Sequence, residues 1–196
     1  MFVKICGLSE PEHVEAAVEA GADAVGLVMT RSPRRITPER AAELAALVPE
    51  HVLTVGVFRG EDPDTVRERV LASGVRAIQL HGSGHPHSHF TALKDLDRTL
   101  IRAVSSEADL RCGAFDEDLL LVDAPHAGSG QAWDYAALRG RATGHWLLAG
   151  GLTPETVAGA IAAADPWGVD VSSGVETAPG VKSTDLIRAF LSAARA

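Results

Sequence analysis

The stretch Leu119-Leu120-Leu121-Val122-Asp123 places four apolar residues in succession before an acid. A strand with one face in water alternates apolar and polar residues, whereas a strand covered on both faces is apolar throughout. Strands covered on both faces are typical of parallel sheets, because the connecting helices pack against each side. The stretch therefore predicts a buried strand of a parallel sheet, with Asp123 at its carboxyl end.

Seven similar apolar runs are spread along the rest of the chain. They cover residues 3–6, 24–28, 54–58, 77–80, 100–104, 146–149 and 168–171. Segments with apolar residues at helical spacing separate these runs. We expect eight helices, at about residues 10–20, 37–48, 63–73, 87–96, 106–115, 133–140, 153–164 and 183–195.

This alternation of eight strands with eight helices predicts the α/β class and a closed (β/α)8 barrel, also known as a TIM barrel. No linker or change of composition divides the chain, so residues 1–196 are expected to form a single domain. A doubly wound open sheet is the alternative arrangement. It normally has fewer strands and a glycine-rich nucleotide loop, and the chain contains neither GxGxxG nor GxxxxGKS.

Four segments carry the signature of a helix start, which is a Ser, Thr or Asp, a proline and an early carboxylate. The first side chain can cap free backbone N–H groups, proline is tolerated in the first turn, and the carboxylate suits the positive end of the helix dipole. We therefore expect capping by Ser9, Thr37, Asp62 and Thr153.

Composition and charge limit the possible partners. Of 196 residues, 46% are hydrophobic and 22% are charged, which is typical of a packed globule. The net charge of −8 argues against binding to nucleic acid or to an anionic membrane, because both need a basic surface. No long apolar run and no leader segment is present, so we expect a cytoplasmic protein. Cys6 and Cys112 are expected to stay unpaired in that compartment.

The residues after the strands are expected to form the active site, because barrels of this kind place it at the carboxyl ends of their strands. Glycine and serine are frequent after the sixth, seventh and eighth strands, at Gly128-Ser129-Gly130, Gly150-Gly151 and Ser172-Ser173-Gly174. Glycine lets backbone N–H groups approach an anion, so the last two clusters predict a phosphate site. The first cluster is expected to cover the same ligand as a loop. Simple tight turns are the alternative.

Two residues at strand ends could move protons. Cys6 follows an apolar run and precedes Gly7; a thiol there becomes a base if a positive neighbourhood, such as that of Lys4, lowers its pKa. Asp123 emerges from an apolar floor, which should raise the pKa of its carboxyl group and favour an acid. The alternatives are a small core side chain for Cys6 and a strand-end cap for Asp123.

The chain contains one cluster of histidines and one of arginines that could bind a ligand. The segment His85-Pro86-His87-Ser88-His89 lacks the helical spacing and carboxylate partner of a zinc site, so we expect a solvated loop and no metal. His81 ends the fourth strand and is expected to line the pocket. The arginines of the segment 31–35 could bind a small anion.

Motifs along nearly the whole chain resemble those of the phosphoribosylanthranilate isomerases of tryptophan biosynthesis. These motifs are VKICGL (3–8), GADAVGLV (21–28), SPRR (32–35), VGVF (55–58), IQLHG (78–82), LLVD (120–123), GSG (128–130), LAGGLTPETV (148–157) and GVDVSSGVE (168–176).

The resemblance implies the (β/α)8 fold and an Amadori rearrangement of N-(5′-phosphoribosyl)anthranilate without metal or cofactor. Cys6 matches the general base, Asp123 the general acid, and Arg34 the residue that holds the anthranilate carboxylate. We also expect substrate binding by residues at the strand ends, and these are His81, Gly128, Ser129, Gly130, Gly150, Gly151, Asp170, Ser172, Ser173 and Gly174. The only expected partner is the small phosphoribosyl substrate, bound by a monomer.

Two other functions remain open from the sequence. The related isomerase of histidine biosynthesis performs the same rearrangement on a larger bisphosphate, typically with two aspartates and a second phosphate site, and one enzyme could accept both substrates. A barrel that binds a phosphosugar without catalysis is the other alternative, and it would keep binding after loss of Cys6 or Asp123.

Overall fold

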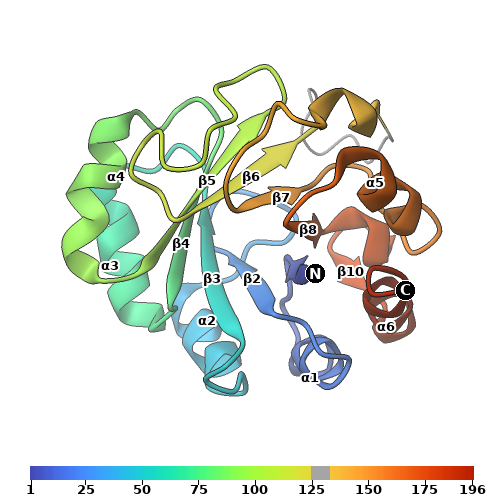
Figure 1. Ribbon diagram of the computed structural model, residues 1–196. Helices are drawn as coiled ribbons and strands as arrows, with labels where there is room; N and C mark the ends of the chain where they lie inside the picture. Colours follow the sequence, from blue (N-terminus) through green and yellow to red (C-terminus); the bar gives the residue numbers. More distant parts are fainter. Residues whose placement is uncertain (125–132) are drawn as a thin grey trace.

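The computed structural model describes residues 1–124 and 133–196, which form a closed barrel of eight parallel strands in chain order (Figure 1). The strands are β1 (Phe2–Cys6), β2 (Ala24–Val28), β3 (Leu53–Phe58), β4 (Ala77–His81), β5 (Thr99–Ser105), β6 (Leu119–Asp123), β7 (Trp146–Leu148) and β8 (Gly168–Val171). The barrel closes where β1 pairs with β8. The predicted fold class is confirmed, and each predicted strand agrees with the structure to within one residue at either end.

The helices lie around the outside of the strands (Figure 1). The α-helices in the described part are α1 (Pro11–Glu19), α2 (Pro38–Ala45), α3 (Pro63–Ser73), α4 (His87–Leu93), α5 (Val157–Ala164) and α6 (Thr184–Ala193). Three short 3-10 helices, η1 (Lys94–Leu96), η2 (Tyr135–Leu138) and η3 (Ser173–Val175), and a hairpin of β9 (Glu176–Ala178) and β10 (Val181–Lys182) complete the structure. The helix predicted at 133–140 is reduced to η2, and the helix predicted at 106–115 is absent.

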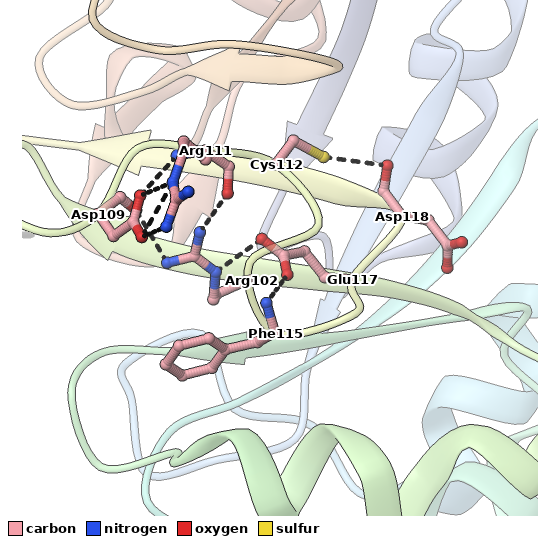
Figure 2. A network of polar contacts seen from close by, with 7 residues as sticks. All are labelled: Arg102, Asp109, Arg111, Cys112, Phe115, Glu117 and Asp118. Atoms are coloured by element: carbon pink, nitrogen blue, oxygen red, sulfur yellow. Dashed lines mark hydrogen bonds and ion pairs between the residues drawn. The ribbon is translucent and has the colours of Figure 1, made fainter.

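A buried ion pair takes the place of the helix expected at 106–115. The Arg102 side chain leaves the outer face of β5 and donates to Glu117 Oε1 at 2.7 Å (Figure 2). It also donates to two backbone carbonyl oxygens, those of Asp109 at 3.0 Å and Arg111 at 2.8 Å. The guanidinium lies over the ring of Phe115, 4.9 Å from its centroid. One cation thus holds a loop of turns against the strand, where a helix would otherwise cover it.

The core has two layers because successive strand residues face opposite sides. Leu119 and Leu121 belong to the cluster inside the barrel, whereas Leu120 and Val122 belong to the cluster between the barrel and its outer cover. This explains why the run is apolar throughout. Continuing the alternation places Asp123 on the inner side at the carboxyl end of β6, and Cys6 is likewise part of the inner cluster.

Two of the four predicted helix caps are confirmed. The side chains of Thr37 and Asp62 accept hydrogen bonds from backbone N–H groups of α2 and α3. The predictions for Ser9 and Thr153 are wrong. Glu10 stands at the N-cap of α1 without a side-chain bond, and a turn that includes a bond from Thr153 N to Thr156 Oγ1 precedes α5.

Two further findings concern the described residues as a whole. Both cysteines are free, as expected, and none of the helices described is long and apolar enough to cross a membrane.

Replacing Glu117 by Gln should lower the free energy of unfolding by about 3 kcal/mol, because the Arg102 charge then stays buried without a counter-charge. Urea unfolding at pH 7, followed by circular dichroism, measures this change. The matched control is Glu43→Gln in the exposed Arg40–Glu43 pair, which should cost less than about 1 kcal/mol. Equal effects of the two substitutions would contradict the structural role of the buried pair.

Candidate active site

Two adjoining cavities lie at the carboxyl ends of the strands and share Arg34, Asp123, Asp170 and Ser172. The larger has a volume of about 300 Å³ and is lined by Cys6, Val28, Thr30, Arg31, Ser32, Pro33, Arg34, Val57, Arg59, Gln79, His81, Leu121, Asp123, Asp170 and Ser172. The smaller is lined by residues that follow β6, β7 and β8, together with Arg34. The structure therefore brings together every described residue that the sequence predicted for the site. Gly128, Ser129 and Gly130 lie outside the described residues.

The carboxyl group of Asp123 is mostly buried at the end of β6. Burial raises its pKa from 3.8 to about 6, although the backbone N–H of Ala124 donates to Oδ1 at 2.8 Å and opposes the shift. The direction agrees with the sequence prediction. Gly150 has φ of +84°, and a Cβ atom there would lie 2.7 Å from Asp123 Oδ1. Glycine is therefore required for the end of β7 to approach the acid this closely.

The thiol of Cys6 is buried at the end of β1, with only 7% of the residue exposed. Gly26 of β2 makes room for it, because a Cβ atom at that position would lie 2.7 Å from Sγ. Burial raises the pKa of the Cys6 thiol above its usual value, while the charge of Lys4 opposes this shift. The sequence leaves the direction of this shift open, and the structure raises the pKa because the cost of burying a thiolate exceeds the attraction of the nearby cation.

Lys4 forms an ion pair with Asp170 where β1 pairs with β8 and closes the barrel. Its Nζ donates to Asp170 Oδ1 at 2.7 Å, and its side chain is fully buried. Lys4 and Asp170 are register partners on β1 and β8. The ion pair gives Lys4 the compensating charge that burial demands and keeps a cation close to Cys6.

His81 lines the larger cavity, as predicted, at the end of β4. Its Nε2 lies 3.8 Å from Asp123 Oδ2. Burial, followed by the charge of Arg59, lowers the pKa of His81 to about 4. The imidazole is therefore neutral near pH 7, and it can donate or accept a hydrogen bond without charge.

The turns after β7 and β8 pack tightly against one another. A Cβ atom on Gly174 would lie 1.8 Å from the carbonyl oxygen of Leu152, so packing alone requires glycine at this position. Ser173 and Gly174 belong to η3, and Gly150 and Gly151 both have positive φ. This geometry leaves a wall of backbone and small side chains on the smaller cavity.

Sequence reasoning missed Gln79, which lines the larger cavity, and two residues linked to Arg34 that line neither cavity, Glu176 and Lys182. Glu176 accepts two hydrogen bonds from Arg34, and Lys182 donates to the same carboxylate. Gln79 is 2% exposed and lines the larger cavity, and its Oε1 has no partner among the described residues. A signal existed for Gln79, because it interrupts an otherwise apolar strand. Glu176 lies at the end of a quoted motif, but its partner is 142 residues away in the chain.

The expectation of a solvated histidine loop is wrong for His85. This side chain is buried, and its Nε2 accepts a hydrogen bond from Gly60 N at 2.9 Å. His85 Nδ1 lies 3.2 Å from His89 Nδ1, whereas His87 is exposed at the start of α4. In the described part of the chain, no cluster of three His, Cys, Asp or Glu residues is arranged to hold a metal.

The fold and the cavity place the chain in the class of (β/α)8-barrel enzymes whose reactive groups lie at the carboxyl ends of the strands. The family model of N-(5′-phosphoribosyl)anthranilate (PRA) isomerase matches residues 3–193. The chain belongs to this family. It is an isomerase of tryptophan biosynthesis that converts N-(5′-phosphoribosyl)anthranilate to 1-(2-carboxyphenylamino)-1-deoxyribulose 5-phosphate.

Individual relatives are similar to this chain over nearly its whole length. The N-(5′-phosphoribosyl)anthranilate isomerase of Paracoccus denitrificans is 44% identical over 209 residues, which cover 99% of this chain and 97% of that protein. The crystal structure of TrpF from Jonesia denitrificans has a TM-score of 0.90 and 45% identity, covering 100% and 97% of the two chains. A phosphoribosylanthranilate isomerase crystallised with reduced 1-(o-carboxyphenylamino)-1-deoxyribulose 5-phosphate has a TM-score of 0.86 and 35% identity, covering 100% and 98%.

Replacing Asp123 by Asn should stabilise the protein at pH 8 and not at pH 3.5. The native carboxyl group, with a pKa of about 6, binds its proton more tightly than in the unfolded chain, where the pKa is near 3.8. The stabilisation from that proton is complete below pH 3.8 and is lost as the pH rises through 6. The neutral amide avoids this loss, so the variant should gain about 2–3 kcal/mol at pH 8.

Urea unfolding of both proteins between pH 3.5 and 8 measures this difference. A difference in unfolding free energy that does not change with pH would contradict the raised pKa of Asp123.

Proposed function

We propose that Asp123 is the general acid and Cys6 the general base of the rearrangement. The observation that carries this proposal is that both side chains line one cavity of about 300 Å³, from the carboxyl ends of β6 and β1. The cavity is large enough for a phosphoribosyl compound and small enough for two groups in it to contact one sugar.

In the first step, the protonated carboxyl group of Asp123 gives its proton to the ring oxygen of the ribose. The bond between this oxygen and C1′ breaks, and the nitrogen lone pair forms an iminium double bond to C1′. A carboxyl group with a pKa near 6 suits this step, because it is a better proton donor near neutral pH than an ordinary aspartate, which is almost fully ionised.

In the second step, the Cys6 thiolate removes the proton from C2′. The electron pair of that C–H bond neutralises the iminium ion and gives an enolamine. Tautomerisation of the enolamine, with transfer of one proton to C1′, yields the ketone at C2′. Ketonisation releases the proton of the C2′ hydroxyl as C1′ gains one. After these steps Asp123 is ionised and Cys6 is a thiol, and transfer of one proton from Cys6 to Asp123 restores the starting state, so no further reactant is needed.

The two raised pKa values determine which of the two groups carries a proton in the free enzyme. At pH 7 most molecules carry an ionised Asp123 and a neutral thiol, whereas the reaction begins from the opposite arrangement. The reactive arrangement is therefore the minor distribution of protons over these two groups. The positive charges of Lys4 and Lys182 lower the cost of forming the thiolate in that arrangement.

We assign the two anionic ends of the substrate to different parts of the site. Arg34 holds the anthranilate carboxylate, since a guanidinium can bind a carboxylate through two parallel hydrogen bonds. The loops after β7 and β8, with Gly150, Gly151 and Ser172–Gly174, hold the phosphate. His81 and Asp170 contact the sugar between them. The solved relative that contains the reduced product, with its carboxylate and phosphate, supports a ligand of this shape.

The cellular setting follows from the proposed chemistry. A base thiol must remain reduced, and both cysteines are free, so we place the enzyme in the cytoplasm. We propose that it acts as a monomer. The large apolar side chains exposed in the described part belong to separate segments, and they are Met1, Leu47, Leu71, Trp167 and Val181. Light scattering at micromolar concentration tests the monomer.

Substitution of Cys6 by Ser should lower kcat by at least about 100-fold, because a serine hydroxyl is a far weaker base in the same position. KM should change little, since the thiol acts on the reacting C–H bond rather than in binding. Anthranilate fluorescence with freshly generated phosphoribosylanthranilate measures both constants. Normal turnover by the variant would show that another group is the base.

The same assay separates the alternative functions. Turnover of phosphoribosylanthranilate should be lost in Asp123→Asn as well as in Cys6→Ser, whereas a barrel that only binds phosphosugars has no turnover to lose. Assay of the wild type with the histidine-pathway substrate tests dual specificity. We expect no turnover of this substrate, because Cys6 stands where that family typically has an aspartate.

A further inference from the structure

We propose that Glu176 is a positioning residue that holds the Arg34 guanidinium in the orientation needed to bind the anthranilate carboxylate. This inference rests on the role proposed above for Arg34. Glu176 lies at the start of the β9–β10 hairpin, beyond the barrel strands, and it does not line either cavity.

The geometry of the pair leaves one edge of the guanidinium for a ligand. Arg34 donates from Nε to Glu176 Oε1 at 2.6 Å and from Nη2 to Oε2 at 2.8 Å. These two donors form the side edge of the guanidinium plane. The end edge, formed by Nη1 and the second hydrogen of Nη2, has no hydrogen bond to any described residue, and Arg34 lines both cavities. A second carboxylate can therefore bind the end edge through two hydrogen bonds while Glu176 keeps the side edge.

Glu176 is charged throughout the working range of pH. Burial acts to raise its pKa, but hydrogen bonds from Arg34 and Lys182 outweigh this and lower the pKa to about 2. Its side chain is only 5% exposed. The negative charge therefore balances the two cations and prevents their mutual repulsion, while one net positive charge remains for the substrate carboxylate.

Lys182 connects the same carboxylate to the other end of the site. Its Nζ donates to Glu176 Oε1 at 2.8 Å and to the backbone carbonyl oxygen of Ser172, also at 2.8 Å. Glu176 and Lys182 are register partners in the hairpin, so the backbone pairing sets their spacing. One hairpin thus fixes both Arg34 and the first residue of the turn after β8.

The hairpin also packs directly against the loop that carries Arg34. Gly180 has φ of +83°, and a Cβ atom there would lie 2.9 Å from the carbonyl oxygen of Pro33. The aliphatic part of the Arg34 side chain lies against Gly7, where an added Cβ atom would be 2.6 Å from Arg34 Cδ. Packing of the backbone at Pro33 and of the Arg34 side chain against Gly7 therefore restricts the arginine, which reduces the conformational entropy that binding would otherwise cost.

The test compares two ligands that differ only in the carboxylate. One is the reduced product, reduced 1-(o-carboxyphenylamino)-1-deoxyribulose 5-phosphate, and the other is its phenylamino analogue without the carboxyl group. Isothermal titration calorimetry gives the ratio of their Kd values for each variant. For the wild type we expect a ratio of about 100, on the scale of a charge-assisted bidentate pair.

In Glu176→Gln the ratio should fall to about 10 or less, because the amide cannot accept both hydrogen bonds and Arg34 loses its fixed orientation. A purely structural role would weaken both ligands equally and leave the ratio near 100. Should Glu176→Gln not fold, Glu176→Asp retains the charge on a shorter side chain, and its ratio should lie between about 10 and about 100. An unchanged ratio in the folded variant would overturn the inference.

Two controls separate this inference from the function on which it rests. Glu117→Gln removes the carboxylate of the other buried Arg–Glu pair, away from the cavities, and should keep the ratio near 100. Arg34→Ala should bring the ratio close to 1. A ratio near 100 in Arg34→Ala would refute the role of Arg34 itself, whereas loss of the ratio there, together with its retention in Glu176→Gln, would refute only the role of Glu176.

Discussion

The alternation of side chains along a closed parallel barrel is the constraint on which the site depends. Every second strand residue must face the interior, so a residue at the end of a strand that continues this alternation opens into the cavity. Cys6 follows the inward Lys4, and Asp123 follows the inward Leu121. A barrel that closes between β1 and β8 brings these ends around one mouth. The reactive groups are therefore placed by the same pattern that packs the core.

Burial in that mouth sets the chemistry of the groups. It raises the pKa of both Asp123 and Cys6, and it lowers that of His81. Each shift favours the neutral form, which is the expected effect of removing water from an ionisable group. Two cations of the site are paired, Lys4 with Asp170 and Arg34 with Glu176. The site thus combines proton carriers whose pKa values are shifted toward their neutral forms with two paired cations, and the substrate brings two anionic ends into it.

Much of the fold could be predicted because it follows from local patterns. Continuous apolar runs marked all eight strands, and Thr37 and Asp62 marked true helix starts. The prediction of a helix at 106–115 is wrong because Arg102 donates hydrogen bonds to Glu117 and to two backbone carbonyl groups of this segment. No local sequence pattern indicates these contacts. The prediction of a solvated His85 is wrong for a similar reason, since the buried imidazole accepts a hydrogen bond from Gly60 in another loop. These two errors arose where polar contacts outside the local pattern outweighed local preference, whereas the wrong caps at Ser9 and Thr153 are local.

The sequence by itself determined the strand order, the barrel, the family and the residues that meet at the strand ends, because periodicity and motif spacing act along the chain. Only the tertiary structure decided how those residues are charged and oriented. The Glu176 carboxylate that accepts hydrogen bonds from Arg34 lies 142 residues from it in the chain. The raised pKa of Cys6 depends on how completely the fold excludes water. Through-space pairing and desolvation are properties of the packed molecule, and no stretch of sequence contains them.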